Sequence, residues 1–407
     1  MKHYTFHLVS LVHLPQSRTY MSCAFTQKNR KMAKILTSLG HEVFFYGSEG
    51  SDVEEYCNSD KLHFIQTHTL KDIIDDYGEG DNRFEVGYNW MNKDFKHDFN
   101  TTKKPSTIKF YKNCVLEINK NKKKDDFLLL SQGNYFEPIK KYVNFSKYLT
   151  CEFGIGYRGS VKSNQRAFES SYIQNYTYGS EYGLNTCGNG SYYDRVIPNY
   201  FDPDDFIYSD KKKDYFLFIG RMILRKGILT AYEVAKTLNK KLIIVGQGAR
   251  VIDGNLVDDE PHEFTLPKGN WEYQGFVDVG KRKKLMSEAT AVFTPTIYLE
   301  CFAGTHVESM LSGTPPITTN FGVFPGTIPD NLNGKVGFRC NTLQDFVDAA
   351  KKAKYVDHKE IRKYGERFLM DNVKYEFQKW FNDLYQVYLS STDATIKGWS
   401  NLKLDKP

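Results

Sequence analysis

The sequence lacks the cysteine pattern of a disulfide-stabilised or zinc-binding protein. Its 407 residues include seven cysteines, an odd number, widely spaced and without any CxxC pair. Small secreted folds and structural zinc sites depend on paired or closely spaced cysteines. We therefore expect free thiols, a reducing compartment and a cytoplasmic location.

Long hydrophobic runs are also missing. A membrane-spanning helix needs about 18 or more consecutive apolar residues, and no such run occurs. The N-terminal stretch MKHYTFHLVSLVHLP is interrupted by His7 and His13, which makes it too short and too polar for a signal peptide. We expect no transmembrane segment.

A strong charge of one sign is absent as well. The net charge is +6, from 55 Lys and Arg against 49 Asp and Glu. So mild a positive net charge suits an anionic substrate such as a nucleoside diphosphate and does not by itself indicate nucleic acid.

The amino-acid composition is rich in Lys, Asn and Tyr, which is typical of an AT-rich genome. A viral source would then place the protein in the host cytoplasm.

Strand and helix patterns alternate along the first half of the chain. The predicted strands are residues 4–12, 41–46, 126–131 and 148–152. Residues 26–39 have helical apolar spacing and stop at Gly40, which completes a βαβ opening typical of a parallel, doubly wound sheet. Residues 50–110 are polar and poorly periodic, so we expect an irregular insertion there.

The same alternation returns in the second half. The predicted strands are residues 215–219, 241–245, 291–295 and 315–319, and the predicted helices are 228–238, 281–287, 304–311, 342–353 and segments within 359–389. The fold class is therefore α/β, with two Rossmann-like domains. We expect an N-terminal domain over 1–199, a second domain over 200–375, and a final helix within 376–407 that crosses back to the first.

A basic loop follows the predicted strand 215–219. It reads GRMILRKG and carries Arg221, Arg225 and Lys226. Loops at the carboxyl ends of parallel strands bind ligands in α/β folds, and an Arg fork with a Lys point charge suits a diphosphate. A solvated basic loop explains the pattern about equally well.

Another loop, PTIYLECFAG, follows the predicted strand 291–295 and leads into a helix. Gly304 permits close backbone approach, and free N–H groups at a helix start can hold phosphate oxygens. Glu308, one turn into the helix, has the chemistry to accept hydrogen bonds from ribose hydroxyls. The alternative makes Glu300 an ordinary loop residue and Glu308 an acid matched to the helix dipole.

Together these segments resemble the retaining GT-B glycosyltransferases of family 4. The residues that carry the resemblance are Arg221 and Lys226, Gln247-Gly248, the pair Glu300 and Glu308 at E-x7-E spacing, and Ser312-Gly-Thr-Pro315. Residues 196–199 with Asp202 are similar to the family's VIPNGVD segment, and residues 331–337 to its xxNGxxG turn. The resemblance covers roughly residues 190–390 well and the N-terminal half only in outline.

The resemblance implies a GT-B fold, with two Rossmann-like domains facing across a cleft. The donor, a UDP- or GDP-sugar, would bind mainly to the C-terminal domain and the acceptor to the N-terminal domain, without a cofactor or metal. Arg221 and Lys226 would bind the diphosphate, and Glu300 would contact the donor sugar beside the reacting centre. The remaining implied donor contacts are Gln247, Gly248, Phe302, Ala303, Gly304, Thr305 and Glu308.

Three departures from the family pattern matter. The family's E-G-F-G becomes Glu300-Cys-Phe-Ala303, which leaves the donor sugar open. The loop after the first strand lacks the family's glycine pair and begins at His13 instead. In place of the family's T-x-H segment stands Thr150-Cys-Glu152, followed by a glycine-rich stretch. We expect sugar or acceptor contacts from His13, Glu152, Tyr157 and Arg158.

The hypothesis is a glycosyltransferase that moves a sugar to a glycan or other hydroxyl acceptor with retention of anomeric configuration. The alternatives are an inverting transferase, a nucleotide-sugar epimerase, glycosylation of hydroxylated bases in DNA, and a non-catalytic sugar-nucleotide binder. Nucleic acid enters only as an acceptor. The one DxD-like string, Asp202-Pro-Asp204, is interpreted as a turn rather than a metal site.

Overall fold

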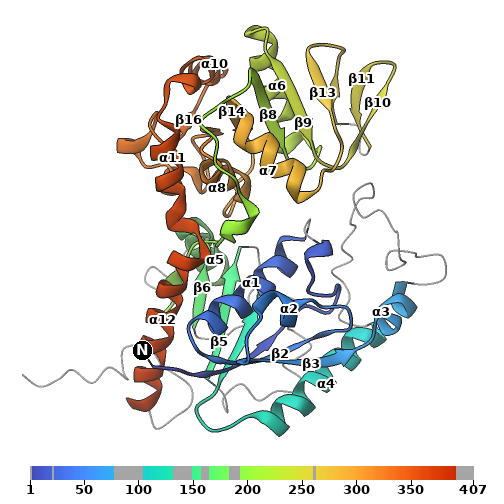
Figure 1. The fold of residues 1–407 in the computed structure, drawn as a ribbon, viewed down its shortest axis with the longest axis vertical. Coiled ribbons are helices and arrows are strands. Elements are labelled where there is room, and N and C mark those ends of the chain that lie inside the picture. Colours follow the sequence, from blue (N-terminus) through green and yellow to red (C-terminus); the bar gives the residue numbers. More distant parts are fainter. Residues whose placement is uncertain are drawn as a thin grey trace, which may run out of the picture. The chain divides into compact units, whose positions relative to one another are not determined.

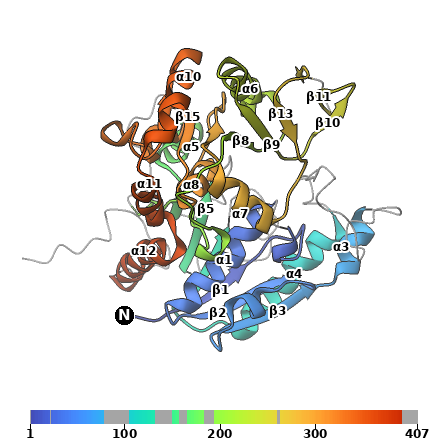
Figure 2. The same cartoon turned by 45° about the horizontal axis from the view of Figure 1, so that its top comes forward.

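The computed structural model describes residues 2–20, 23–77, 104–131, 149–156, 165–182, 193–259 and 263–390. The chain divides into two compact units (Figures 1 and 2). The first contains the described residues up to Tyr200 together with Met370–Ser390, and the second contains those within Phe201–Leu369. Each unit is described by itself.

The first unit is built on a seven-stranded parallel sheet with the order β3-β2-β1-β4-β5-β6-β7. Its strands are β1 (Thr5–Val9), β2 (Glu42–Ser48), β3 (Leu62–His68), β4 (Phe127–Ser131), β5 (Leu149–Ile155), β6 (Arg166–Phe168) and β7 (Arg195–Val196). Its helices are α1 (Ala24–Ser38), α2 (Val53–Cys57), α3 (Leu70–Tyr77), α4 (Pro105–Asn121), α5 (Ser171–Tyr182) and α12 (Met370–Ser390). The strand order reverses direction between β1 and β4, which is the Rossmann arrangement.

Helix α12 belongs to the core of this first unit, although it is the last helix described. It lies beside the sheet in Figure 1, where it is drawn in red. Phe377, Trp380 and Phe381 are almost fully buried in one cluster with Phe6 and Phe127. Because Trp380 Nε1 donates a 2.9 Å hydrogen bond to the Tyr193 carbonyl, its one polar group is satisfied in the core.

The expected irregular insertion over residues 50–110 is wrong for most of the described part of that range. The structure has α2, β3 and α3 between residues 53 and 77, and α4 begins at Pro105. β3 is the edge strand of the sheet, and only three of its seven residues are buried. A half-exposed edge strand carries no continuous apolar run, which is why periodicity missed it.

The second unit contains a six-stranded parallel sheet with the order β13-β9-β8-β14-β15-β16. Its strands are β8 (Tyr215–Ile219), β9 (Lys241–Val245), β13 (Trp271–Tyr273), β14 (Ala291–Thr294), β15 (Pro316–Thr319) and β16 (Phe338–Cys340). Its helices are α6 (Ile228–Thr237), α7 (Val279–Glu288), α8 (Gly304–Leu311), α9 (Phe324–Thr327), α10 (Leu343–Lys352) and α11 (His358–Gly365). A small antiparallel sheet consists of β10 (Ala249–Ile252), β11 (Asn255–Asp258) and β12 (Thr265–Leu266).

Both faces of the six-stranded sheet are covered by helices. Phe216 and Phe218 of β8 pack with residues of α6 and α10, while Tyr215 and Leu217 pack on the opposite face with Met286 of α7. Alternate residues of one strand thus serve two cores, so the strand reads as a continuous apolar run. The α/β fold class with two Rossmann-like sheets is confirmed. None of the helices in the described ranges is long and apolar enough to cross a membrane.

Candidate functional site

The predicted donor segments leave the second sheet at its topological switch point. β8 lies between β9, which follows it in sequence, and β14, which comes much later. Loops after two such strands diverge and leave a crevice at the carboxyl edge, where open α/β sheets bind ligands. The loop 220–227 follows β8, and the loop 295–303 follows β14. Topology therefore brings together the two segments that the sequence predicted.

The loop after β8 ends in a 3₁₀ turn, Leu224–Lys226, closed by Gly227 in the left-handed conformation (φ 80°). A Cβ at Gly227 would lie 2.0 Å from the Pro295 carbonyl oxygen, so any larger residue would push the two loops apart. The Ile297 amide also donates a 3.0 Å hydrogen bond to the Arg225 carbonyl. The glycine thus allows the two predicted donor loops to pack backbone against backbone.

Lys226 and Glu300 form an ion pair across these two loops. The Lys226 ammonium also donates a 2.7 Å hydrogen bond to the Tyr298 hydroxyl, and the Arg225 guanidinium lies 5.1 Å from the centre of the same ring. The Lys226 side chain keeps 22 % exposure, whereas that of Glu300 keeps 9 %. A cation and a carboxylate are therefore held together at the carboxyl edge, with the cation still open to a ligand.

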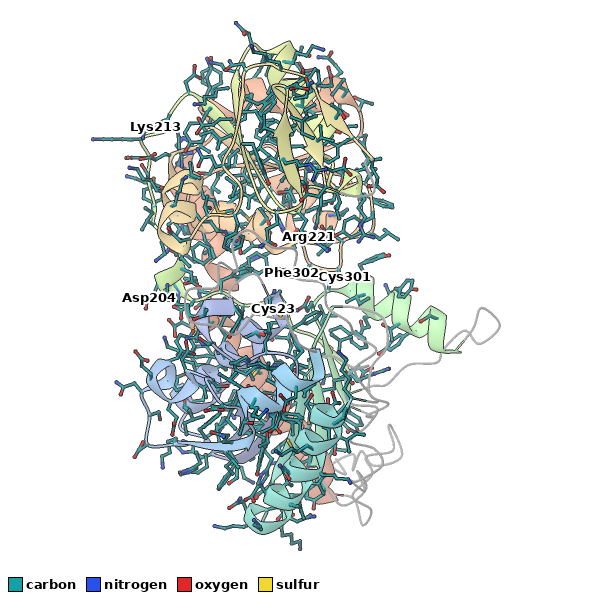
Figure 3. All side chains as sticks on the ribbon, turned by 90° about the vertical axis from the view of Figure 1, so that its right-hand side faces the viewer. Cys23, Asp204, Lys213, Arg221, Cys301 and Phe302 are labelled. Atoms are coloured by element: carbon teal, nitrogen blue, oxygen red, sulfur yellow. The ribbon has the colours of Figure 1, made fainter. Side chains whose placement is uncertain are left out.

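Arg221 is exposed at the start of the same loop. Figure 3 shows it at the same end of the second unit as Cys301 and Phe302. This end of the unit therefore presents two basic side chains, Arg221 and Lys226, whose fork and point charge together suit a diphosphate.

The start of α8 has an unusual backbone. Ala303, at the N-cap position, adopts φ 59° and ψ 59°, a left-handed conformation that is uncommon outside glycine, and no side chain caps the helix. The uncapped N–H groups at such a start carry partial positive charge. The Phe302 side chain instead packs into a buried cluster with Phe201 and Phe368. Any donor contact by residue 302 would therefore come from its backbone.

The His306 side chain holds the start of α8 in place through two hydrogen bonds. Its Nδ1 donates to the Ala303 carbonyl at 2.6 Å, and its Nε2 pairs with the Thr327 hydroxyl at 2.8 Å. Burial lowers the pKa of His306 to about 4, so the ring is neutral at pH 7. A neutral ring with one donor and one acceptor satisfies both partners at once.

Glu308 forms an ion pair with Arg282 of α7. Arg282 lies in a run of four cations, residues 281–284, and burial lowers its pKa to about 10. Its guanidinium remains charged at neutral pH, and it orients a carboxylate that keeps 13 % exposure. Sequence reasoning missed Arg282 because nothing distinguishes it from the other cations of that run. Tyr298 was missed too, since a single tyrosine in a loop carries no signal.

Gln247 and Gly248 follow β9 and lie next to the first donor loop. The Met222 amide donates a 2.8 Å hydrogen bond to the Gln247 carbonyl, and the Gly246 amide donates one of 2.9 Å to the Gly275 carbonyl. A Cβ at Gly246 would lie 1.7 Å from the Gly220 carbonyl oxygen, which explains a glycine at that position. Main-chain contacts thus link the segment that carries Gln247 and Gly248 to the predicted donor loop after β8 and to Gly275.

Two of the four residues expected on the acceptor side, His13 and Glu152, lie within the described ranges. His13 lies in the loop after β1, at the switch point of the first sheet, and its Nε2 lies 3.4 Å from the Cys23 sulfur. Burial lowers its pKa to about 4. Glu152 lies inside β5 and is fully buried. Tyr157 and Arg158 lie outside the described residues, so all four roles stay predictions.

Two other features bear on the site. Within the described ranges, no three His, Cys, Asp or Glu side chains form a group that could hold a metal ion. The DxD-like string Asp202-Pro-Asp204 forms the expected turn: the Asp202 side chain caps a 3₁₀ turn by accepting a 3.0 Å hydrogen bond from the Asp204 amide.

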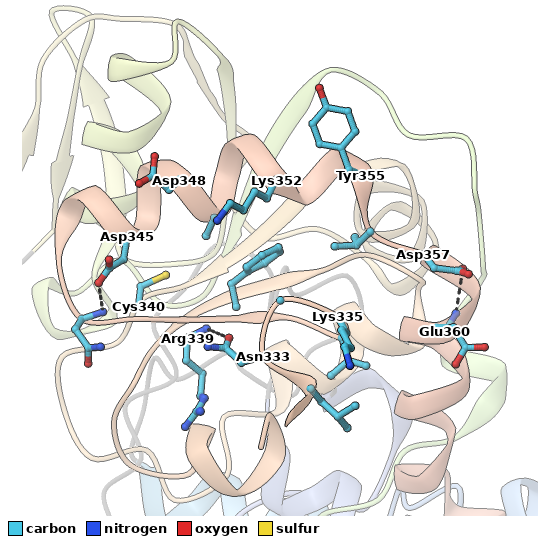
Figure 4. A pocket seen from close by; sticks show the side chains of 17 residues that line it. Asn333, Lys335, Arg339, Cys340, Asp345, Asp348, Lys352, Tyr355, Asp357 and Glu360 are labelled. Atoms are coloured by element: carbon cyan, nitrogen blue, oxygen red, sulfur yellow. Dashed lines mark hydrogen bonds between the residues drawn. The ribbon is translucent and has the colours of Figure 1, made fainter. Parts of the chain in front are cut away.

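A separate groove of about 870 Å³ lies beside β16, α10 and α11 (Figure 4). Its lining includes Asn333, which accepts a hydrogen bond from the Arg339 amide at 2.9 Å, and the exposed Tyr355. None of the predicted donor residues lines it. The groove is therefore distinct from the site at the switch point.

Comparison with known proteins agrees with this geometry. Residues 204–368 match the model of the family described as glycosyl transferases group 1, and this range includes both predicted donor loops and α8. The chain is a glycosyltransferase. A comparison with curated protein sequences finds no match.

Solved structures similar to this enzyme show the fold. They include AviGT4, a glycosyltransferase of avilamycin A biosynthesis (16 % identity, 94 % of this chain and 98 % of that chain, TM-score 0.59). Sucrose-phosphate synthase from Thermosynechococcus elongatus matches at 14 % identity (94 % and 99 %, TM-score 0.60). HepE from Anabaena, solved with UDP and glucose, matches at 11 % identity (94 % and 100 %, TM-score 0.52). The GT-B fold expected from the sequence is confirmed.

Proposed function

We propose that the enzyme transfers a sugar from a nucleoside-diphosphate sugar to an acceptor hydroxyl with retention of anomeric configuration. The observation that carries the proposal is the Lys226–Glu300 pair at the switch point, with Arg221 on the same loop. A carboxylate suited to sugar hydroxyls stands beside cations suited to a diphosphate. We place the enzyme in family 4, the retaining family that the sequence resembles.

The chemistry demands such an arrangement. When the bond between the anomeric carbon and the diphosphate breaks, negative charge builds on the leaving oxygen. Preorganised cations and a helix N-terminus stabilise that charge without reorganisation. We assign Arg221, Lys226 and the start of α8 to the diphosphate, Glu308 to the ribose, and Glu300 to the donor sugar. With the charge balanced in this way, the proposed transfer needs no divalent metal.

Retention follows in this proposal from attack on the face that the diphosphate leaves. The departing phosphate oxygen accepts the proton of the acceptor hydroxyl, so no protein base is required. We propose UDP as the donor nucleotide, in keeping with HepE having been solved with UDP, and a glycan as the acceptor. The acceptor is assigned to the first unit, and the location to the cytoplasm.

A screen for hydrolysis of nucleotide sugars tests the donor assignment. Wild-type enzyme, Glu300→Ala, Lys226→Ala and the surface control Glu233→Ala are each incubated with UDP- and GDP-sugars. We expect the first two variants to lose activity and the control to keep it. Undiminished activity in both active-site variants would show that the site lies elsewhere.

Anomeric NMR of the transfer product tests retention, and a chelator tests independence from metal. An inverted product would indicate a general base over the acceptor instead. Release of free sugar with a changed configuration would indicate an epimerase. Nucleotide binding without turnover on glycan, protein and hydroxymethylated DNA acceptors would indicate a non-catalytic binder. Turnover on hydroxymethylated DNA alone would show that the acceptor is nucleic acid.

A further inference from the structure

The connection between β9 and β13 departs from the usual Rossmann pattern. These strands are parallel neighbours, with Trp271 opposite Leu242, and a parallel connection usually contains a crossover helix. The described part of this connection holds the small sheet instead. β10 pairs with β11 from Ala249 opposite Asp258 to Ile252 opposite Asn255, and β12 adds a third strand.

The base of this small sheet is joined to the donor edge. The Asp259 amide donates a 2.9 Å hydrogen bond to the Gly248 carbonyl, directly beside Gln247. The Asp258 carboxylate is fully buried and accepts hydrogen bonds from the Glu263 amide at 2.8 Å and the Phe264 amide at 3.1 Å. Phe264 is itself anchored in the core of the unit, so the backbone beside Glu263 is held at this point.

The Glu263 carboxylate reaches the loop that carries the donor cations. Its Oε2 accepts a 3.2 Å hydrogen bond from the amide of Leu224, the first residue of the 3₁₀ turn Leu224–Lys226. The first N–H groups of a helix have no partner within it. The turn closes through the Lys226 amide to the Ile223 carbonyl at 3.0 Å. Glu263 therefore caps the turn that ends in Lys226.

We propose that Glu263 is a positioning residue for the donor diphosphate, acting through the 3₁₀ turn that presents Lys226. The inference rests on the proposed function. An acid beside a diphosphate site repels the ligand, so its presence there needs a compensating role, which the cap supplies. The required property is the hydrogen-bond acceptor and not the charge. A glutamine, which keeps a carbonyl oxygen at the same distance along the side chain, therefore satisfies it.

Calorimetric titration of the full chain with UDP, GDP and ADP tests the proposal. We compare wild type, Glu263→Ala, Glu263→Gln and the control Glu233→Ala. Glu233 is a half-exposed acid of α6 that lies 3.7 Å from Lys236 on the same helix. Glu263→Ala is expected to weaken binding of the preferred diphosphate about three- to tenfold, the usual effect of losing one ordinary hydrogen bond. Glu263→Gln and the control are expected to stay within about twofold of wild type.

The other possible binding results would overturn either the positioning role of Glu263 or the proposed function. Equal binding by wild type and Glu263→Ala would overturn the positioning role while leaving the donor site intact. Tighter binding by both Glu263 variants would mean that the carboxylate competes with phosphate. If wild type binds none of the diphosphates, the proposed function fails first, and the inference with it. Thermal unfolding midpoints of all variants show that they are folded, and the KM for the donor sugar should follow the calorimetric affinities.

Discussion

Lys226 and Glu300 lie 74 positions apart in the chain and form an ion pair at the carboxyl edge of the second sheet. Each follows a different central strand, β8 or β14, so the pair spans the switch point of the fold. An ion pair with a partly open cation suits a site that receives an anion, because the ligand can replace the carboxylate as the partner of the lysine.

Lys226→Ala should lower kcat by about 100- to 1000-fold, the usual effect of removing one preorganised group that stabilises a developing negative charge. Lys226→Arg is the matched control, since it keeps the charge but changes the donor geometry, and it should retain part of the activity. Steady-state transfer assays with the donor from the screen measure both. An unchanged kcat in Lys226→Ala would remove Lys226 from the diphosphate site.

Arg282→Met should raise the KM for the donor several-fold with a smaller change in kcat, because Glu308 loses the partner that orients it. Glu308→Gln should likewise raise the KM for the donor more than it changes kcat. The double variant should cost less than the two single variants together, since both remove the same interaction. Lys284→Ala, in the same cationic run and exposed, is the control. Additive effects would show that the two residues act separately.

Ala303→Gly should stabilise the fold. A left-handed alanine costs about 1–2 kcal/mol, and a glycine removes that cost while adding some entropy to the unfolded chain. The net gain in free energy of unfolding is expected to be about 0.5–1 kcal/mol, measured by urea denaturation. Ala235→Gly, inside α6, should instead destabilise by about 1 kcal/mol. Destabilisation by Ala303→Gly would contradict the strain at this loop.

The stability of the enzyme should fall as pH drops from 6.5 to 4, and His306 should contribute to that fall. Burial lowers its pKa from 6.5 to about 4, so in this window the unfolded chain binds a proton that the folded chain does not. The contribution is complete above pH 6.5 and is lost progressively below it. Burial lowers the pKa of His13 and His41 in the same direction, so His306→Gln should reduce the slope without abolishing it.

Urea denaturation of wild type and His306→Gln at pH 7, 6, 5 and 4.5 measures this difference. The gap between the two free energies of unfolding should change across the series in favour of the variant as the pH falls. Parallel curves would mean that His306 titrates in the folded protein as it does in the unfolded chain.

Much of the second unit could be predicted from the sequence because its central strands are buried on both faces. Strand β8 was predicted at its observed bounds, and the loops predicted to bind the donor do follow the buried strands β8 and β14. Edge elements were not predicted. β3 is half exposed and three of the four residues of β10 are exposed, so neither carries the apolar run that marks a buried strand.

The sequence by itself determined the alternation of strands and helices, the two sheets, and the residue types at the donor edge, since these depend on local patterns of apolar side chains, glycines and charges. Only the tertiary structure decided which side chains meet. That Lys226 pairs with Glu300, Arg282 with Glu308, and Glu263 with the Leu224 amide depends on strand order and on a small sheet in place of a crossover helix. Such contacts join positions far apart in the chain, and no local pattern specifies them.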